Sequence, residues 1–214
     1  MLNLLPQDRL RRLAQPVALA LARTGITPNT VTMAGVLGNV GAAALLARGK
    51  FLPGGALVLA ASALDAVDGA LARATGRSSV SGAVLDAVMD RVSEAAVLLG
   101  LLVFYSGRGR REEEILCSVA MAGSLLVSYV RARAEAQGLP LREGLFTRTE
   151  RVTLLGVGLI MDQVRIALWL LAVLSNGTAV QRLYVAWLRA TQGNGPPASP
   201  ARQKAGEETG GRAR

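Results

Sequence analysis

Long apolar runs alternate with short charged segments along most of this chain of 214 residues. The stretch from Thr30 to Ala47 carries no charged residue, and an uncharged run of that length is typical of a membrane-spanning helix. Five further apolar runs follow it, at residues 51–65, 80–107, 115–130, 152–161 and 166–180. The pattern predicts an all-α integral membrane protein with six transmembrane helices.

The two ends of the chain differ from this membrane region. Apolar residues recur at helical spacing near the N-terminus, beside several arginines, which predicts an amphipathic helix lying on the membrane surface. A helix of a soluble core is the alternative for this segment. The C-terminal end is rich in Gly, Pro, Ser and charge, a composition typical of disorder. We therefore expect a juxtamembrane amphipathic helix at 1–23, a six-helix transmembrane domain at 24–190 and a disordered cytoplasmic tail at 191–214.

The composition narrows the possible chemistry and the possible partners. The chain has no histidine, which excludes a His-based acid or base and the usual zinc sites. Its single cysteine, Cys117, excludes an internal disulfide. The net charge is +9, but the basic residues are scattered between apolar runs and aromatic residues are few, so membrane lipids are favoured over nucleic acid. Most basic residues fall on one side of the membrane if both termini are cytoplasmic, as the positive-inside rule requires.

Four aspartates interrupt the apolar pattern. Asp65 and Asp68 are spaced i, i+3, and Asp86 and Asp90 are spaced i, i+4, so each pair shares one face of a helix. The polar break at 75–79 allows the two helices to turn these faces toward each other. A charged residue within a membrane span costs roughly 2.5–3.5 kcal/mol on insertion scales. Four converging carboxylates therefore indicate a functional site, and divalent cations are the ligands that would neutralise them.

Small and basic residues beside the aspartates suit a bulky anionic ligand. Gly69, Ala72 and Gly82 leave space where a ligand approaches the backbone, and Arg73 is placed to meet a phosphate. Helix capping or pairing with nearby arginines is an alternative that accounts for one or two aspartates, but not for four. A transporter that uses membrane aspartates and a non-catalytic scaffold are the rival functions.

The spacing of these residues resembles the signature of the CDP-alcohol phosphotransferase family. The match is Asp65-x-x-Asp68-Gly69-x-x-Ala72-Arg73, eight residues, Gly82, three residues, Asp86, three residues and Asp90. Members of this family have six spans after an N-terminal surface helix, so the resemblance covers roughly residues 5–190. They use magnesium or manganese while an alcohol displaces CMP from a CDP-linked lipid.

The resemblance implies a role for each residue of the motif. Asp65, Asp68 and Asp86 would hold two Mg²⁺ ions, for which Mn²⁺ is a substitute, and Asp90 would touch a metal and act as general base on the incoming hydroxyl. The CDP-lipid would lie against a further group of residues: Asn29, Thr32, Asp68, Gly69, Ala72, Arg73 and Gly82. The resemblance also implies a homodimer in a prokaryotic plasma membrane, with its active site at the cytoplasmic face.

Two features bear on the acceptor alcohol. Residues 128–138, taken with RTER at 148–151 and QR at 181–182, resemble the branch of the family that makes phosphatidylinositol phosphate in prokaryotes, and so does the LDAVMDR end of the motif. In that branch, basic residues hold the inositol phosphate, and their counterparts here are Arg131, Arg148, Arg151 and Arg182. A plain positive-inside role is the alternative for these arginines.

The sequence therefore favours one reaction. We expect transfer of a phosphatidyl group from CDP-diacylglycerol to the hydroxyl of a phosphorylated polyol, myo-inositol phosphate, with release of CMP. Glycerol 3-phosphate is the alternative acceptor, and with it the protein would be a phosphatidylglycerophosphate synthase.

Overall fold

The computed structural model contains helices and connecting turns over the residues that it describes, which are 16, 27–74, 79–141, 144 and 146–192. The long helices in this part of the chain are α2 Pro28–Ala47, α3 Phe51–Ala74, α4 Val80–Ser106, α5 Arg111–Ala136, α6 Arg148–Ile160 and α7 Val164–Thr191. The prediction of an all-α protein is confirmed for these residues. The predicted surface helix at 1–23 and the predicted tail at 191–214 lie almost entirely outside them.

Four of the described helices are long and apolar enough to cross a membrane, namely Pro28–Ala47, Phe51–Leu71, Arg111–Ala136 and Val164–Thr191. The other two predicted spans do not meet this standard. α4 has 27 residues, but three carboxylates and an arginine lie between its residues 86 and 94. With 13 residues, α6 extends about 20 Å, less than the hydrocarbon core of a bilayer. The architecture is that of an integral membrane protein, with α4 and α6 as its less apolar members.

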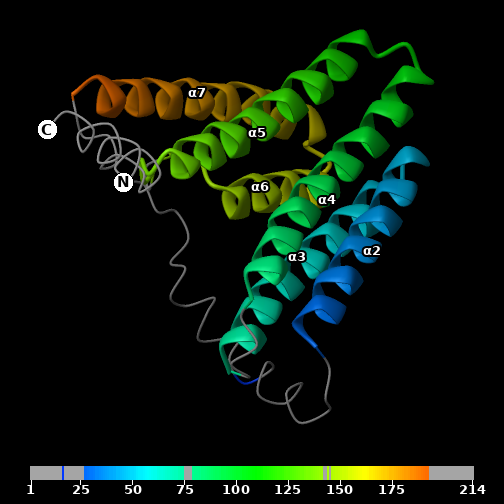
Figure 1. Cartoon of the computed structure of the whole chain (residues 1–214). Helices are drawn as coiled ribbons and strands as arrows, with labels where there is room; N and C mark the ends of the chain where they lie inside the picture. The colour runs from blue at the N-terminus through cyan, green and yellow to red at the C-terminus, as the bar shows by residue number, and fades with distance from the viewer. Residues whose placement is uncertain (1–15, 17–26, 75–78, 142–143, 145, 193–214) are drawn as a thin grey trace, which may run out of the picture.

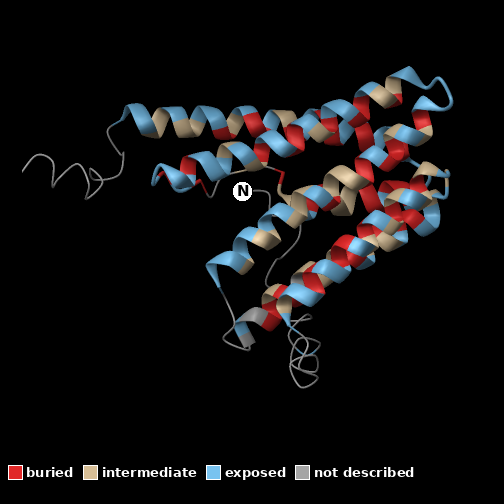
Figure 2. Cartoon of the chain, turned by 45° about the vertical axis from the view of Figure 1, so that its right-hand side comes forward, coloured by how far each residue is buried: buried red, intermediate tan, exposed pale blue. Residues whose placement is uncertain are grey.

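The helices converge at one end of the molecule and spread apart toward the other (Figure 1). One apolar core joins all six described helices, from Ala42 and Leu46 in α2 to Leu168 and Leu171 in α7. Figure 2 shows the buried residues concentrated where the helices converge. The motif aspartates lie in the C-terminal part of α3 and the N-terminal part of α4, away from this densely packed end.

One helix supports both halves of the aspartate motif. α2 packs along α3 and along α4, whereas α3 and α4 make few contacts with each other. In Figure 1, the three helices run side by side. α6 packs against α3 and against α7, and this places its first turn near the aspartates.

Apolar side chains also cover the outside of the helices. Leu37 of α2, Leu125 of α5, and Trp169, Val173 and Trp187 of α7 are all exposed. Large outward-facing apolar side chains spread over long helices are what contact with lipid tails requires. The exposed surface therefore agrees with a membrane location for this part of the chain.

Local hydrogen bonds fix the first turns of α2, α4 and α6. Thr27 Oγ1 accepts from the N–H of Thr30 at 3.3 Å and so caps the N-terminus of α2. Ser79 Oγ accepts from the N–H of Gly82 at 3.0 Å and starts α4. A capping box starts α6, in which the N–H of Thr147 donates to the Glu150 carboxylate at 2.6 Å.

Candidate active site

The two aspartate pairs lie on different helices whose acidic residues interact through space. Asp65 and Asp68 belong to α3, and Asp86 and Asp90 belong to α4. The carboxylate of Asp86 lies within electrostatic range of each of the other three. Like charges at this range repel one another, so the arrangement requires positive charge nearby.

α2 fixes the position of the two aspartates on α3. Thr32 Oγ1 donates a buried hydrogen bond of 2.8 Å to Asp68 Oδ2. A Cβ atom added to Gly35 would lie 3.1 Å from Asp65 Oδ1, so a larger residue at this position would crowd that carboxylate. Thr32 and Gly35 are spaced i, i+3 and therefore share the face of α2 that supports the motif. Thr32 was predicted from the sequence as a site residue and Gly35 was not, although its i, i+3 spacing from Thr32 was an available signal.

A guanidinium group lies between the two acidic helices. Nη1 of Arg148 is 2.7 Å from Asp65 Oδ2 and 3.1 Å from Asp90 Oδ1. Arg148 is the first residue of α6 and precedes the apolar run of that helix. Burial lowers the pKa of Arg148, but the carboxylates of Asp90 and Asp65 outweigh this effect and the net shift is upward. The side chain is therefore a permanent cation between two carboxylates.

The carboxylates are spread around this cation. As placed, no group of three or more His, Cys, Asp or Glu side chains in the described part of the chain is arranged to hold a metal ion. Asp86 Oδ1 is buried and has no hydrogen-bond partner among the described residues. A buried carboxylate oxygen without a partner is costly, so a cation or a donor from a ligand would be favourable there.

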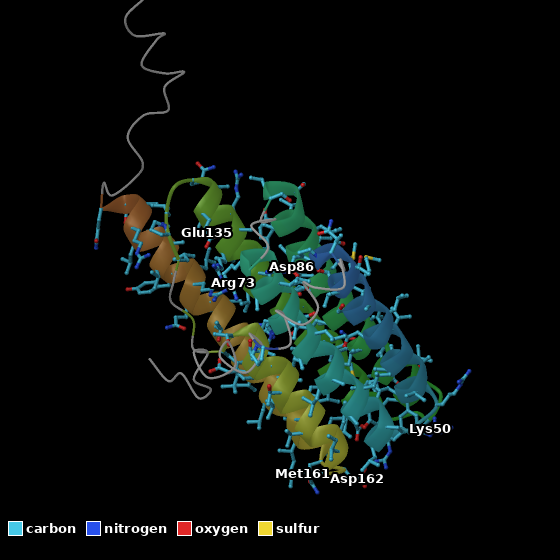
Figure 3. All side chains as sticks on the ribbon, turned by 90° about the horizontal axis from the view of Figure 1, so that it is seen from below. Lys50, Arg73, Asp86, Glu135, Met161 and Asp162 are labelled. Carbon is cyan, nitrogen blue, oxygen red and sulfur yellow. The ribbon has the colours of Figure 1, made fainter. Side chains whose placement is uncertain are left out.

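A cleft of about 210 Å³ opens beside the aspartates, between the start of α2, the end of α3 and the start of α4. It is lined by six of the residues that the sequence analysis assigned to the CDP-lipid, namely Asn29, Thr32, Asp68, Gly69, Arg73 and Gly82. The backbone of the seventh, Ala72, lies in α3, but its side chain is outside the part of the structure that is described. Pro28, Ser79, Ala83 and Asp86 complete the lining. Figure 3 shows Arg73 and Asp86 away from the end that carries Lys50, Met161 and Asp162.

Two glycines line the cleft. A Cβ atom on Gly82 would lie 3.0 Å from Ser79 Oγ and 3.7 Å from Asn29 Oδ1, and both of these residues line the cleft. A Cβ atom on Gly69 would lie 3.5 Å from Arg73 Nη1, which is ordinary contact distance. Gly82 is therefore the more restrictive position of the two, because a side chain there would press on the N-cap of α4.

The four arginines considered for the acceptor have different surroundings. Arg148 faces the aspartates, whereas Arg151 is buried and faces the interior of the molecule. Nη1 of Arg182, on α7, donates to the carbonyl oxygen of Val127 at 3.0 Å. Arg131 is exposed on α5 and its Nε donates to Glu135 at 2.8 Å. The guanidinium groups of Arg131 and Arg151 are close enough to Arg182 to repel it, although Glu135 and Glu94 offset the charges of the first two.

A buried ion pair lies under Arg148. Arg151 donates to both carboxylate oxygens of Glu94, with Nε to Oε1 at 2.7 Å and Nη2 to Oε2 at 2.9 Å. Arg151 and Glu94 also line a small internal cavity of about 20 Å³, together with Arg148 and Ser62. Glu94 was not predicted from the sequence, although it continues the i, i+4 series of Asp86 and Asp90 on α4.

One protein-family model matches most of the chain, including the residues of this site. The model for CDP-alcohol phosphatidyltransferase matches residues 25–189, which include the aspartate motif, the cleft and Arg148. This chain belongs to the CDP-alcohol phosphatidyltransferase family. The family that the sequence motif predicts is thereby confirmed.

Members of the family that resemble this chain match most of its length. This chain is 38% identical over 193 residues to the phosphatidylinositol phosphate synthase of Mycobacteroides abscessus. That match covers 86% of this chain and 88% of that protein. The crystal structure of Mycobacterium tuberculosis phosphatidylinositol phosphate synthase with CDP-DAG bound has a TM-score of 0.76 and 36% identity, covering 88% of this chain and 97% of that one. The structure of the same synthase with manganese and citrate also has a TM-score of 0.76, with 35% identity, covering 87% and 91%.

Proposed function

We propose that this protein is a metal-dependent phosphatidyltransferase that joins CDP-diacylglycerol to a myo-inositol phosphate and releases CMP. Membership of the CDP-alcohol phosphatidyltransferase family supports the reaction type. The observation that carries the choice of acceptor is the 38% identity to a phosphatidylinositol phosphate synthase over most of both chains. The position of Arg148 between the motif aspartates adds a cation suited to a phosphorylated acceptor.

The carboxylates of the motif fit divalent cations. The metal ligands that the motif offers are carboxylate oxygens, which Mg²⁺ and Mn²⁺ prefer. One of these oxygens, Asp86 Oδ1, is buried without a hydrogen-bond partner among the described residues. We assign Asp65, Asp68, Asp86 and Asp90 as the residues that would hold two such ions. When bound, these ions would neutralise the diphosphate and the charge on the departing CMP. The manganese in the structure of the M. tuberculosis synthase supports this dependence on a divalent metal.

The cleft beside the motif is the proposed site for the CDP part of the lipid. Arg73 supplies a cation for the diphosphate, and Asn29 supplies hydrogen-bonding groups at the start of α2. Gly69 and Gly82 leave room for the nucleotide, and Ala72 on α3 is proposed as the third small residue of this site. Thr32 holds Asp68 in place through its 2.8 Å hydrogen bond, so it acts on the nucleotide through that carboxylate.

Asp90 is the proposed general base. The acceptor hydroxyl oxygen forms a bond to the phosphorus on the lipid side of the diphosphate, and the bond from that phosphorus to the bridging oxygen breaks. The bridging oxygen leaves with CMP, and the hydroxyl proton passes to the carboxylate of Asp90. Asp90 lies beside both Asp86 and Arg148, where the diphosphate and the acceptor would meet.

The acceptor phosphate is proposed to bind among the basic residues next to Asp90. Arg148 would contact it directly, because its guanidinium group already lies at the carboxylate of the proposed base. Arg131 and Arg182 would add charge from α5 and α7. Both carboxylate oxygens of Glu94 pair with Arg151 and offset its charge, so Arg151 would act on the acceptor by holding the first turn of α6, and with it Arg148, in place.

The family also supports a membrane arrangement for the enzyme. We propose six spans within residues 24–190, preceded by a surface helix at 1–23 and followed by a disordered cytoplasmic tail at 191–214. The active site and both termini would face the cytoplasm of a prokaryotic cell, with Lys50 on the opposite side. A homodimer is proposed from the family resemblance, and cross-linking in native membranes would test it.

The proposed function is tested by CMP release from purified protein in detergent. The protein is given CDP-diacylglycerol and Mg²⁺ with myo-inositol phosphate, unphosphorylated myo-inositol or glycerol 3-phosphate in separate reactions. The highest kcat/KM is expected with myo-inositol phosphate, and excess chelator should stop the reaction. A higher kcat/KM with glycerol 3-phosphate would reassign the acceptor, and turnover in excess chelator would exclude the metal-dependent mechanism.

A further inference from the structure

Arg148 makes its two ion pairs with residues that the proposed function assigns to metal ions. Its single nitrogen Nη1 is 2.7 Å from Asp65 Oδ2 on α3 and 3.1 Å from Asp90 Oδ1 on α4. Divalent cations bind carboxylate oxygens at about 2.0–2.6 Å. A cation bound to these same oxygens would stand next to the guanidinium group, where the two positive charges repel each other.

The position of Arg148 is set by the helix that carries it. The capping box of Thr147 and Glu150 fixes the first turn of α6, and Arg151 ties that turn to Glu94 on α4. Both ion pairs of Arg148 use Nη1, and Nε is buried without a hydrogen-bond partner among the described residues. Because Nε makes no hydrogen bond in this position, rotation of the guanidinium toward another ligand breaks no hydrogen bond at that atom.

We infer that Arg148 is an exchangeable counter-ion: it competes with a divalent cation for Asp65 and Asp90, and a phosphate that draws its guanidinium away promotes cation binding. This inference rests on the proposed function, which assigns metal ions to these aspartates. Arg148 then has two alternative partners, the carboxylates and the acceptor phosphate. Because a phosphate monoester carries a charge of about −1.5 to −2 and accepts charge-assisted hydrogen bonds, it would attract the guanidinium more strongly than a single carboxylate does and release the carboxylates as it binds.

Thermodynamic linkage gives this exchange a measurable consequence. If phosphate binding frees Asp65 and Asp90 for the cation, cation binding must favour phosphate binding by the same factor. The metal and the phosphorylated acceptor would therefore bind cooperatively, and the cooperativity would depend on the guanidinium of Arg148. If Arg148 only holds α6 against α3 and α4, metal binding and phosphate binding would not be coupled.

The test is an equilibrium titration of the full-length protein in detergent with Mn²⁺, in which free Mn²⁺ is measured by electron paramagnetic resonance. The unmodified protein is compared with Arg148→Gln and with Arg108→Gln. Arg108 lies over the ring of Phe104, in the turn that joins α4 and α5, and provides the same loss of charge far from the aspartates. Each titration is repeated with inorganic phosphate at a fixed concentration, and Arg148→Met, which keeps the length of the aliphatic chain, replaces Arg148→Gln if that variant does not fold.

The inference predicts both the direction and the pattern of the result. Without phosphate, Arg148→Gln should bind Mn²⁺ at least about fivefold more tightly than the unmodified protein, the lower end of typical coupling factors, and Arg108→Gln should not differ from it. Phosphate should tighten Mn²⁺ binding to the unmodified protein and to Arg108→Gln more than to Arg148→Gln. Equal or weaker Mn²⁺ binding by Arg148→Gln would overturn the inference and leave the proposed function in place. Failure of all three proteins to bind Mn²⁺ would overturn the proposed metal site as well.

Discussion

The buried pair of Glu94 and Arg151 should be necessary both for stability and for the position of Arg148. The side chain of Arg151 is 2% exposed and that of Glu94 is 9% exposed, and two hydrogen bonds of 2.7 and 2.9 Å join them. Removing one member of such a pair leaves the other charge buried, at a cost of about 3–5 kcal/mol. Replacing both members by apolar residues is often neutral, because no charge remains to be buried.

The comparison requires three variants of this pair. We expect Arg151→Met to lower the free energy of unfolding by about 3–5 kcal/mol, Glu94→Met to do the same, and the double variant to recover most of the loss. Unfolding is followed in mixed micelles of increasing SDS content by the fluorescence of Trp169 and Trp187, the two tryptophans of the chain. The double variant should still have a raised KM for the acceptor, since it no longer ties the first turn of α6 to α4.

An exposed pair of the same residue types provides the control. The side chains of Arg131 and Glu135 are 52% and 46% exposed, and their ion pair also measures 2.8 Å. Surface pairs contribute about 0–1 kcal/mol, so Glu135→Met should hardly change the unfolding curve. If Arg151→Met lowers the free energy of unfolding no more than Glu135→Met does, the buried pair does not have the expected role. The same holds if the losses in free energy of unfolding of Arg151→Met and Glu94→Met simply add in the double variant.

Three further outcomes follow from the structure. Gly100→Ala places a Cβ atom 2.4 Å from the carbonyl oxygen of Ala43 and should destabilise the protein by about 1–3 kcal/mol in the same unfolding assay. Gly177→Ala, whose Cβ atom would have no described atom within 4 Å, should be neutral or stabilising by up to about 1 kcal/mol. Asp90→Asn should reduce CMP release at least about 100-fold, and unchanged binding of CDP-diacylglycerol would show that the variant is folded. Thr32→Val removes the donor to Asp68 and should weaken CDP-lipid binding about tenfold, as the loss of roughly 1.4 kcal/mol would; an unchanged KM for the lipid would contradict this role.

The aspartate motif could be placed from the sequence because its information is local. The spacing of Asp65 with Asp68, and of Asp86 with Asp90, is read directly against the helical repeat, and the two helices form with these residues near the ends that face the cleft. Gly82 could be placed in the same way, because it stands four residues before Asp86 in the motif and lines the cleft. The span count was less predictable, because the charges of α4 and the 13 residues of α6 depart from the simple hydropathy pattern.

The roles of the arginines could not be read in this way. Arg148 and Arg151 stand three residues apart in RTER and are indistinguishable by type. Packing of α6 separates them, because it turns Arg148 to the aspartates and Arg151 to Glu94, a residue 57 positions earlier in the chain. A contact over that distance in sequence depends on how α4 and α6 pack, and the hydropathy pattern does not report it. Gly35 was missed for a related reason, since its function is to leave space for a carboxylate on another helix.

The most direct test of the central claim is a crystal structure of this protein with Mn²⁺ and CDP-diacylglycerol, in which the anomalous signal locates the metal. The account predicts anomalous peaks within coordination distance of Asp65, Asp68, Asp86 and Asp90, with the diphosphate in contact with the same ions and with Arg73. Metal at any other position, or a cytidine group bound outside the cleft between α2, α3 and α4, would contradict it.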